Sequence, residues 1–70
     1  MDDNKKIQVT THDRLMRAWQ NSMELVTDYE DYSKSIKDDE AIAETFGRLA
    51  EEECVHAAKL RQMLHDYQNR

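Results

Sequence analysis

The apolar residues in the second half of the chain recur at steps of alternately four and three residues. This spacing keeps their side chains on one face of an α-helix, so it predicts an amphipathic helix that packs against a neighbour along one seam. Glu51 and Glu52 lie off this face. The positions of the seam are Ile42, Phe46, Leu49, Glu53, His56, Leu60, Met63 and Tyr67. A glutamate and a histidine therefore occupy the middle of an otherwise apolar seam.

A similar pattern predicts another helix over residues 11–35. Its apolar residues stand mostly three or four positions apart, and they are Leu15, Met16, Trp19, Met23, Val26, Tyr29, Tyr32 and Ile36. Thr10 or Thr11 supplies an N-cap for this helix. Asp13 follows Thr10 by three positions, which is the arrangement of a capping box.

The apolar pattern stops in residues 36–39, where we expect a turn. Asp38 or Asp39 offers an N-cap for the second helix. We therefore expect residues 1–10 to be a flexible N-terminal tail and residues 11–70 to form one helical domain.

The two predicted helices make the chain all-α and fold it as an antiparallel hairpin. The chain has 70 residues, no proline and one glycine, so few residues interrupt a helix. A hairpin buries only one face of each helix, and this poorly stabilises a short chain without disulfides. A two-fold dimer would bury the remaining apolar faces in a four-helix bundle. We therefore expect a homodimer or a higher homo-oligomer.

The composition excludes other classes of protein. The formal net charge is −5 and no stripe of basic residues is present, which argues against nucleic acid or an anionic membrane as a partner. No stretch approaches the ~20 apolar residues of a membrane span, and the start of the chain lacks the apolar core of an export signal. The single cysteine, Cys54, excludes an intramolecular disulfide. The default expectation is a cytoplasmic protein.

Glu53 and His56 need a physical reason to lie in a seam, because a buried and unpaired polar group is costly. Residues three apart on a helix share a face, so a carboxylate oxygen and an imidazole nitrogen can converge on one ion. This mixture of ligands suits iron, manganese or zinc. The two residues can instead be structural, hydrogen-bonded to a neighbouring helix and fixing its register. The pattern alone favours neither interpretation.

The segment AETFGRLAEEECVHAAKLRQML resembles the second helix of ferritin-like carboxylate proteins, especially rubrerythrins and the short two-helix encapsulated ferritins. The likeness covers this helix well and the first helix only loosely. The residues that carry it are Phe46, the run from Ala50 to Glu52, the core Glu53-x-x-His56-Ala57, Leu60 and Leu64.

The resemblance implies that two chains form a ferritin-like four-helix bundle around a di-iron or similar centre. Such a centre takes a Glu from each of two helices and a Glu-x-x-His from each of the other two. Glu53 would then bridge the two ions, and His56 would be a terminal ligand. The resemblance also allows an encapsulin shell as a partner, although the end of the chain, HDYQNR, is not a recognisable docking tail.

The glutamate of the first helix has two candidates. Glu24 stands in a Met-Glu-Leu sequence like that of the short two-helix ferritins, and its depth in the hairpin matches Glu53 and His56. The helical wheel, however, places Glu24 opposite Trp19. Glu30 continues the apolar face but lies nearer the bend. Glu24 is the first choice and Glu30 the second.

Two functions from different classes follow. The first is a metal-binding ferritin-like protein with a ferroxidase-like role in iron handling or oxidative-stress defence, with Mn or Zn as other possible metals. The second is a metal-free helical dimerisation module, in which Glu53 and His56 are buried structural residues. No rubredoxin-type cysteine pairs are present, so the chain lacks the electron relay of a full rubrerythrin.

Overall fold

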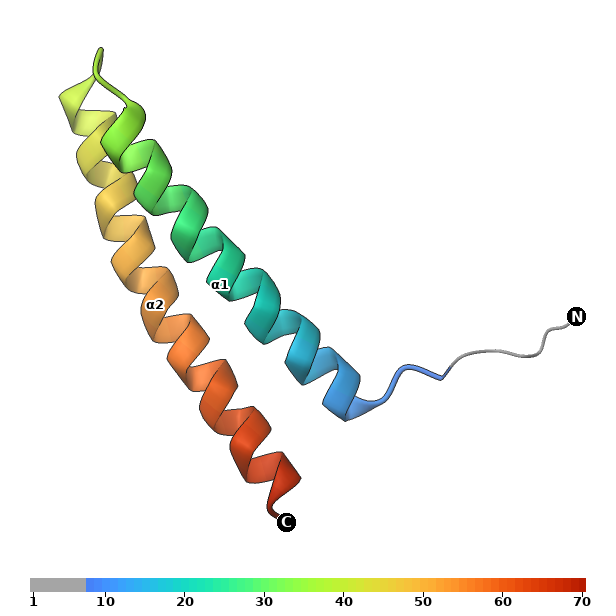
Figure 1. Cartoon of the computed structure of the whole chain (residues 1–70). Helices are drawn as coiled ribbons and strands as arrows, with labels where there is room; N and C mark the ends of the chain where they lie inside the picture. Colours follow the sequence, from blue (N-terminus) through green and yellow to red (C-terminus); the bar gives the residue numbers. More distant parts are fainter. Residues whose placement is uncertain (1–7) are drawn as a thin grey trace, which may run out of the picture.

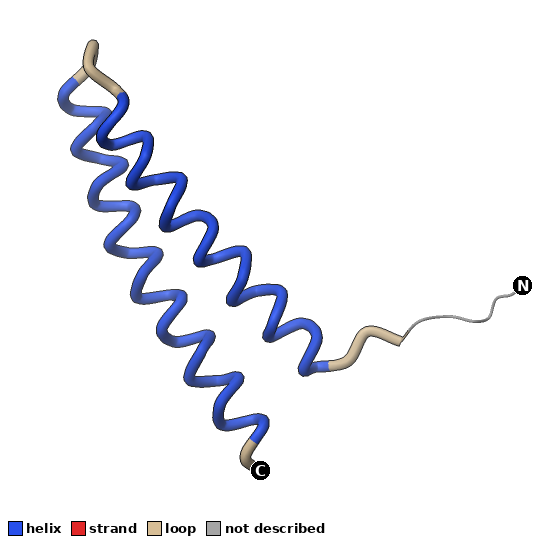
Figure 2. Tube along the Cα trace, in the orientation of Figure 1, coloured by secondary structure: helices blue, strands red, loops and turns tan. Residues whose placement is uncertain are grey.

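The computed structural model describes residues 8–70, which form an antiparallel hairpin of two helices (Figure 1). Helix α1 spans Thr11–Ser35 and helix α2 spans Glu40–Gln68. The all-α prediction and the positions of both helices are confirmed. Residues 36–39 make the connection seen at the bend in Figure 2. Most of the predicted tail, residues 1–7, lies outside the described residues.

Both helices begin at side-chain caps. The Thr10 hydroxyl accepts a hydrogen bond from the Asp13 amide at 3.1 Å, and the Asp13 carboxylate accepts one from the Thr10 amide at 3.2 Å. This is the predicted capping box, and it selects Thr10 over Thr11 as the cap. At the second helix the Asp39 carboxylate accepts a hydrogen bond from the Ile42 amide at 3.1 Å. Asp39, rather than Asp38, is therefore the cap of α2.

The helices touch through small residues. The least exposed side chains are Ser22 and Val26 of α1 and Ala50, Ala57 and Leu64 of α2, each exposed by less than a tenth. Three of the five are alanine or serine, so the two backbones can approach closely. Ser22 lies against Glu53, and near the bend the Phe46 ring packs on Tyr29 and Tyr32 at 5.8 and 5.2 Å between centroids.

Only half of the predicted seam of α2 lies toward α1, where Phe46, Glu53, Leu60 and Tyr67 are half-buried. Ile42, Leu49 and Met63 are 48%, 37% and 47% exposed. The interhelical contact of α2 follows Ala50, Ala57 and Leu64 instead, which lie one position after Leu49, His56 and Met63. The period of the pattern was correct, but its other half, Ile42, Leu49, His56 and Met63, lies on the flank of the contact, about 100° around the helix from Ala50 and Ala57. Alanine is only weakly hydrophobic, so the apolar periodicity of the sequence did not reveal that Ala50 and Ala57 form the helix contact.

The hairpin is a single layer, 11 Å thick along its shortest axis. Figure 1 shows the two helices side by side, and within residues 8–70 no further element covers either broad face. Within residues 8–70, neither helix has a long enough apolar stretch to cross a membrane. Each broad face carries a groove between α1 and α2, and the two grooves are lined by different side chains.

Candidate metal centre

Glu53 stands between a serine of α1 and a histidine of its own helix. The Ser22 hydroxyl donates a hydrogen bond to Oε2 of Glu53 across the helix contact. On the other side, Nδ1 of His56 lies 3.1 Å from Oε1 of Glu53. The Glu53 side chain is 17% exposed, whereas that of His56 is 65% exposed. The two residues singled out in the sequence are thus brought together, with the carboxylate tucked against α1 and the imidazole at the surface.

The environment of Glu53 favours its ionised form. The hydrogen bond from Ser22 is the main cause that lowers the pKa of Glu53 below its ordinary value of 4.5. Partial burial acts in the opposite direction, and the hydrogen bond and positive charge of His56 add to the lowering. Glu53 is therefore a carboxylate at neutral pH, which is the form that ligates metal ions.

The groove that contains this pair, hereafter the Glu53 groove, occupies one broad face of the hairpin. Leu25 lines it, and the exposed Leu49 and Met63 stand seven residues before and after His56 on the same side of α2. The residues that line the groove are Ala18, Asn21, Ser22, Leu25, Glu53, His56, Lys59 and Leu60. The largely buried carboxylate and the exposed imidazole therefore lie among mainly apolar residues.

The opposite groove, hereafter the Cys54 groove, holds different residues. Trp19, Met23 and Val26 line it from α1, and Cys54 and Arg61 from α2. Closer to the bend its lining includes Glu30, Ser33, Gly47 and Cys54.

Neither first-helix glutamate joins the Glu53–His56 pair within one chain. Glu30 lines the Cys54 groove, on the other side of the helix contact. Glu24 is exposed and does not line the Glu53 groove. Across residues 8–70 no three His, Cys, Asp or Glu side chains are grouped so that they could hold a metal ion. Among the described residues, one chain therefore brings together two side chains that could serve as metal donors, Glu53 and His56.

The spacing of these two donors fits a single ion. Two ligand atoms that are each about 2.1 Å from an ion lie about 3.0 Å apart at right angles and about 3.4 Å apart at the tetrahedral angle. The observed 3.1 Å between Oε1 and Nδ1 falls in this interval. An oxygen and an imidazole nitrogen suit iron, manganese or zinc. The pair therefore fits as a half-site for such an ion.

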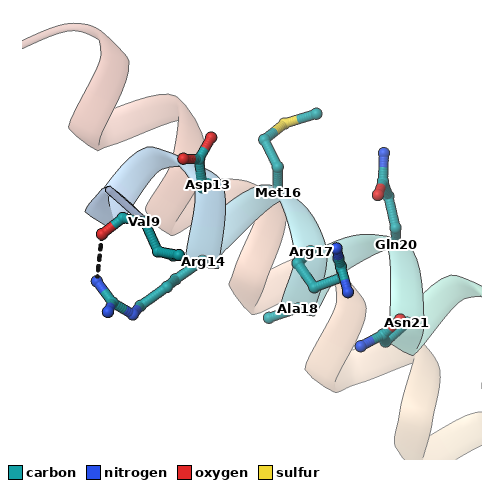
Figure 3. Close-up of a pocket in the computed structure, with 8 residues that line it drawn as sticks. All are labelled: Val9, Asp13, Arg14, Met16, Arg17, Ala18, Gln20 and Asn21. Carbon is teal, nitrogen blue, oxygen red and sulfur yellow. Dashed lines mark hydrogen bonds between the residues drawn. The ribbon is translucent and has the colours of Figure 1, made fainter. Parts of the chain in front are cut away.

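Another hollow lies on α1 alone, near its N-terminal end (Figure 3). Its charged residues are Asp13, Arg14 and Arg17, and Nη1 of Arg14 donates a hydrogen bond to the carbonyl oxygen of Val9 at 3.0 Å. Asp13 is already engaged in the helix cap. The hollow offers no set of free acidic or imidazole donors, and it shares Ala18 and Asn21 with the lining of the Glu53 groove.

Sequence reasoning missed Ser22. The signal was present, because Trp19 and Val26 stand three positions before and four positions after it on the face of α1 that meets α2. A small polar residue in such a series marks a place where the partner helix comes close. It is also the place where a buried carboxylate of that helix finds a donor.

Comparison with known families connects this geometry to a class of protein. The family model described as Rubrerythrin matches residues 10–70, which is nearly the whole chain. The chain belongs to the rubrerythrin family, as the resemblance of its second helix indicated. Comparison with the curated proteins and with the solved structures gives no match.

Proposed function

We propose that two copies of this chain form a four-helix bundle that binds iron between them, with Glu53 and His56 of each copy as ligands. The observation that carries the proposal is the convergence of Oε1 and Nδ1, 3.1 Å apart, in a member of the rubrerythrin family. The two donors of one chain are too few for a stable site, and a second copy doubles them. A dimer would thus complete the set of metal ligands, and the shared metal would stabilise the dimer.

The apolar surface around the pair supports a second copy as the partner. Leu25, Ile42, Leu49 and Met63 are each exposed by between 37% and 48%, and all four are large apolar residues. Ile42, Leu49 and Met63 follow a seven-residue spacing through His56, so they form one stripe along α2. A two-fold axis places this stripe against its own copy, which is how self-complementary dimers close.

Bound iron would supply exchange between Fe(II) and Fe(III), with O₂ or peroxide as the electron acceptor. The role of the protein would be ferroxidase-like, in iron handling or oxidative-stress defence in the cytoplasm. Glu53 would hold the ion with a carboxylate oxygen, and the Ser22 hydrogen bond would fix the direction of that oxygen. His56 would add a nitrogen donor. The di-iron form implied by the resemblance requires further carboxylates, for which Glu24 and Glu30 were the expectation.

One observation favours the metal-free alternative. Both oxygens of Glu53 already have protein partners within one chain, Ser22 at Oε2 and His56 at Oε1. A buried carboxylate that is hydrogen-bonded in this way needs no ion to compensate its burial. In this alternative the chain is a helical dimerisation module, and the pair fixes how the helices meet.

Metal content and mass in solution decide between the two. The purified, tag-free chain is expected to be a dimer or larger assembly that retains Fe after anaerobic addition of Fe(II) and dialysis. Glu53→Gln and His56→Ala should each abolish this retention while circular dichroism shows unchanged helicity. Iron retained by both variants, or a wild-type dimer that stays empty, contradicts the proposal and supports the metal-free module.

The interface has its own matched pair of variants. Leu49→Arg places a charge in the apolar stripe and should dissociate the assembly and release the metal. Val55→Arg makes the same change at a residue that is 64% exposed and lines neither groove. It should leave the mass and the metal content unchanged. Equal behaviour of the two variants would place the interface on another surface.

A further inference from the structure

The α1 side of the Glu53 groove carries no carboxylate in the part of the chain that the structure describes. Its lining from α1 consists of Ala18, Asn21, Ser22 and Leu25. Two metal ions in a helix bundle of this kind are held by four glutamates and two histidines, with a glutamate from each of the four helices. A two-fold dimer closed over this groove presents two glutamates and two histidines, all from α2.

The contacts of Glu53 also disfavour a bridging role. A carboxylate that bridges two ions through both of its oxygens directs one oxygen to each of them. Here Oε2 accepts the hydrogen bond of Ser22, whose side chain is 3% exposed and therefore fixed within the helix contact. Only Oε1 remains on the side of His56, so Glu53 is oriented to give one oxygen to one ion.

The charges of the ligands also favour one metal ion for two chains. Two Glu53 carboxylates carry two negative charges and neutral imidazoles add none, so the charges of the ligands balance one divalent ion, while Lys59 in the lining of the groove adds positive charge that disfavours a second. Two divalent ions would leave two positive charges uncompensated beneath the apolar residues of the interface. An uncompensated charge is expensive to bury. Two oxygen and two nitrogen donors are also the number that a four-coordinate ion requires.

We propose that the assembled dimer binds a single divalent metal ion between its two Glu53–His56 pairs, one ion for two chains, because Asn21 and Ser22 stand where α1 would have to supply carboxylates for a second ion. This inference rests on the proposed function and specifies its metal stoichiometry. Asn21 is the position that limits the site, because it lines the groove beside Ser22 with a side chain only one methylene shorter than glutamate.

The test is the number of ions bound per chain. The full chain is titrated anaerobically with Fe(II), and separately with Zn(II), then dialysed and analysed for metal alongside its mass in solution. One ion for two chains is the expected result. One ion or more per chain overturns this inference and leaves the proposed function intact. No bound ion in a dimeric protein refutes the proposed function itself, and the inference with it.

Two pairs of variants sharpen the result. Glu24→Gln and Glu30→Gln should each leave the stoichiometry unchanged, since neither residue lines the Glu53 groove. Loss of metal in either variant overturns the inference.

Asn21→Glu should raise the capacity to one ion per chain, because it adds a carboxylate from α1 on each side of the interface. Its control is Gln20→Glu, which adds the same charge one position away, at a residue that lines the hollow of Figure 3 and not the Glu53 groove. A capacity that rises equally in both variants, or in neither, overturns the assignment of residue 21.

Discussion

Replacement of Ser22 by alanine tests the most buried polar contact of the hairpin. Ser22 is 3% exposed, and its hydroxyl donates to the Glu53 carboxylate across the helix contact. Alanine fits the same space because it removes a single oxygen atom. The variant should therefore keep the hairpin and lose one interhelical hydrogen bond to a charged group.

The expected cost is about 1.5 kcal/mol at neutral pH. A hydrogen bond to a charged group contributes about 1.5–3 kcal/mol, and the lower end applies where water can replace the lost donor. The Glu53 side chain is 17% exposed in an open groove, so water can reach its carboxylate. A loss of this size changes the ratio of folded to unfolded chains about tenfold.

The cost should depend on pH in a definite direction. Ser22 is the main cause of the lowered pKa of Glu53, whose ordinary value is 4.5. A carboxylate with a lowered pKa in the folded state stabilises the fold above its unfolded pKa, and this stabilisation is lost as the pH falls through the folded pKa. The difference between wild type and Ser22→Ala should therefore be largest at neutral pH and shrink as the pH falls through the pKa of Glu53 in the folded state.

The assay is urea unfolding followed by circular dichroism, at neutral pH and at about pH 3, at one protein concentration because dimerisation adds to stability. Ser33→Ala is the control, since Ser33 is half-buried at the helix contact but lines the Cys54 groove. The reasoning is refuted if Ser22→Ala costs the same at both pH values, or no more than Ser33→Ala at neutral pH.

Two further predictions concern the helices themselves. Asp39→Ala should lower the free energy of unfolding by about 1 kcal/mol, because it removes the side-chain cap of α2, whereas Asp38→Ala should change it by less than about 0.5 kcal/mol. Chemical unfolding of the two variants checks this, and equal effects would contradict the cap assignment. Gly47→Ala places a Cβ atom 3.2 Å from the Ser33 hydroxyl oxygen, so the contact should reduce the gain of about 1 kcal/mol that alanine brings to a helix interior. In a Ser33→Ala background the full gain should return. Thermal unfolding of wild type, the two single variants and the double variant checks this, and an equal effect of Gly47→Ala in both backgrounds would contradict it.

The elements of the fold could be read from local signals. The capping residues and the apolar steps of three and four are properties of neighbouring residues along the chain, and they predicted the bounds of α1 and the start of α2 within a residue or two. Glu53 and His56 were recognised for the same reason, since a three-residue spacing on a helix fixes their relative position.

The partners of that pair could not be read in this way. Glu24 was chosen by the family resemblance and its depth in the hairpin, and Glu30 by the helical wheel. The side of α1 that meets Glu53, however, depends on how the two helices are rotated against each other. Ser22 and the alanines at positions 50 and 57 set that rotation, because they let the backbones approach. Apolar periodicity gives little weight to such small residues.

The sequence by itself therefore determined the two helices, their caps, the bend and the Glu53–His56 pair, since each depends on contacts within a few residues. Only the tertiary structure decided which face of each helix meets the other. That choice tucks Glu53 against Ser22, moves Glu30 to the opposite groove and leaves Leu49 and Met63 exposed beside His56. The physical reason is that small side chains let the two backbones pack closely along Ser22, Ala50 and Ala57, and this contact leaves the larger residues Ile42, Leu49 and Met63 on its exposed flank.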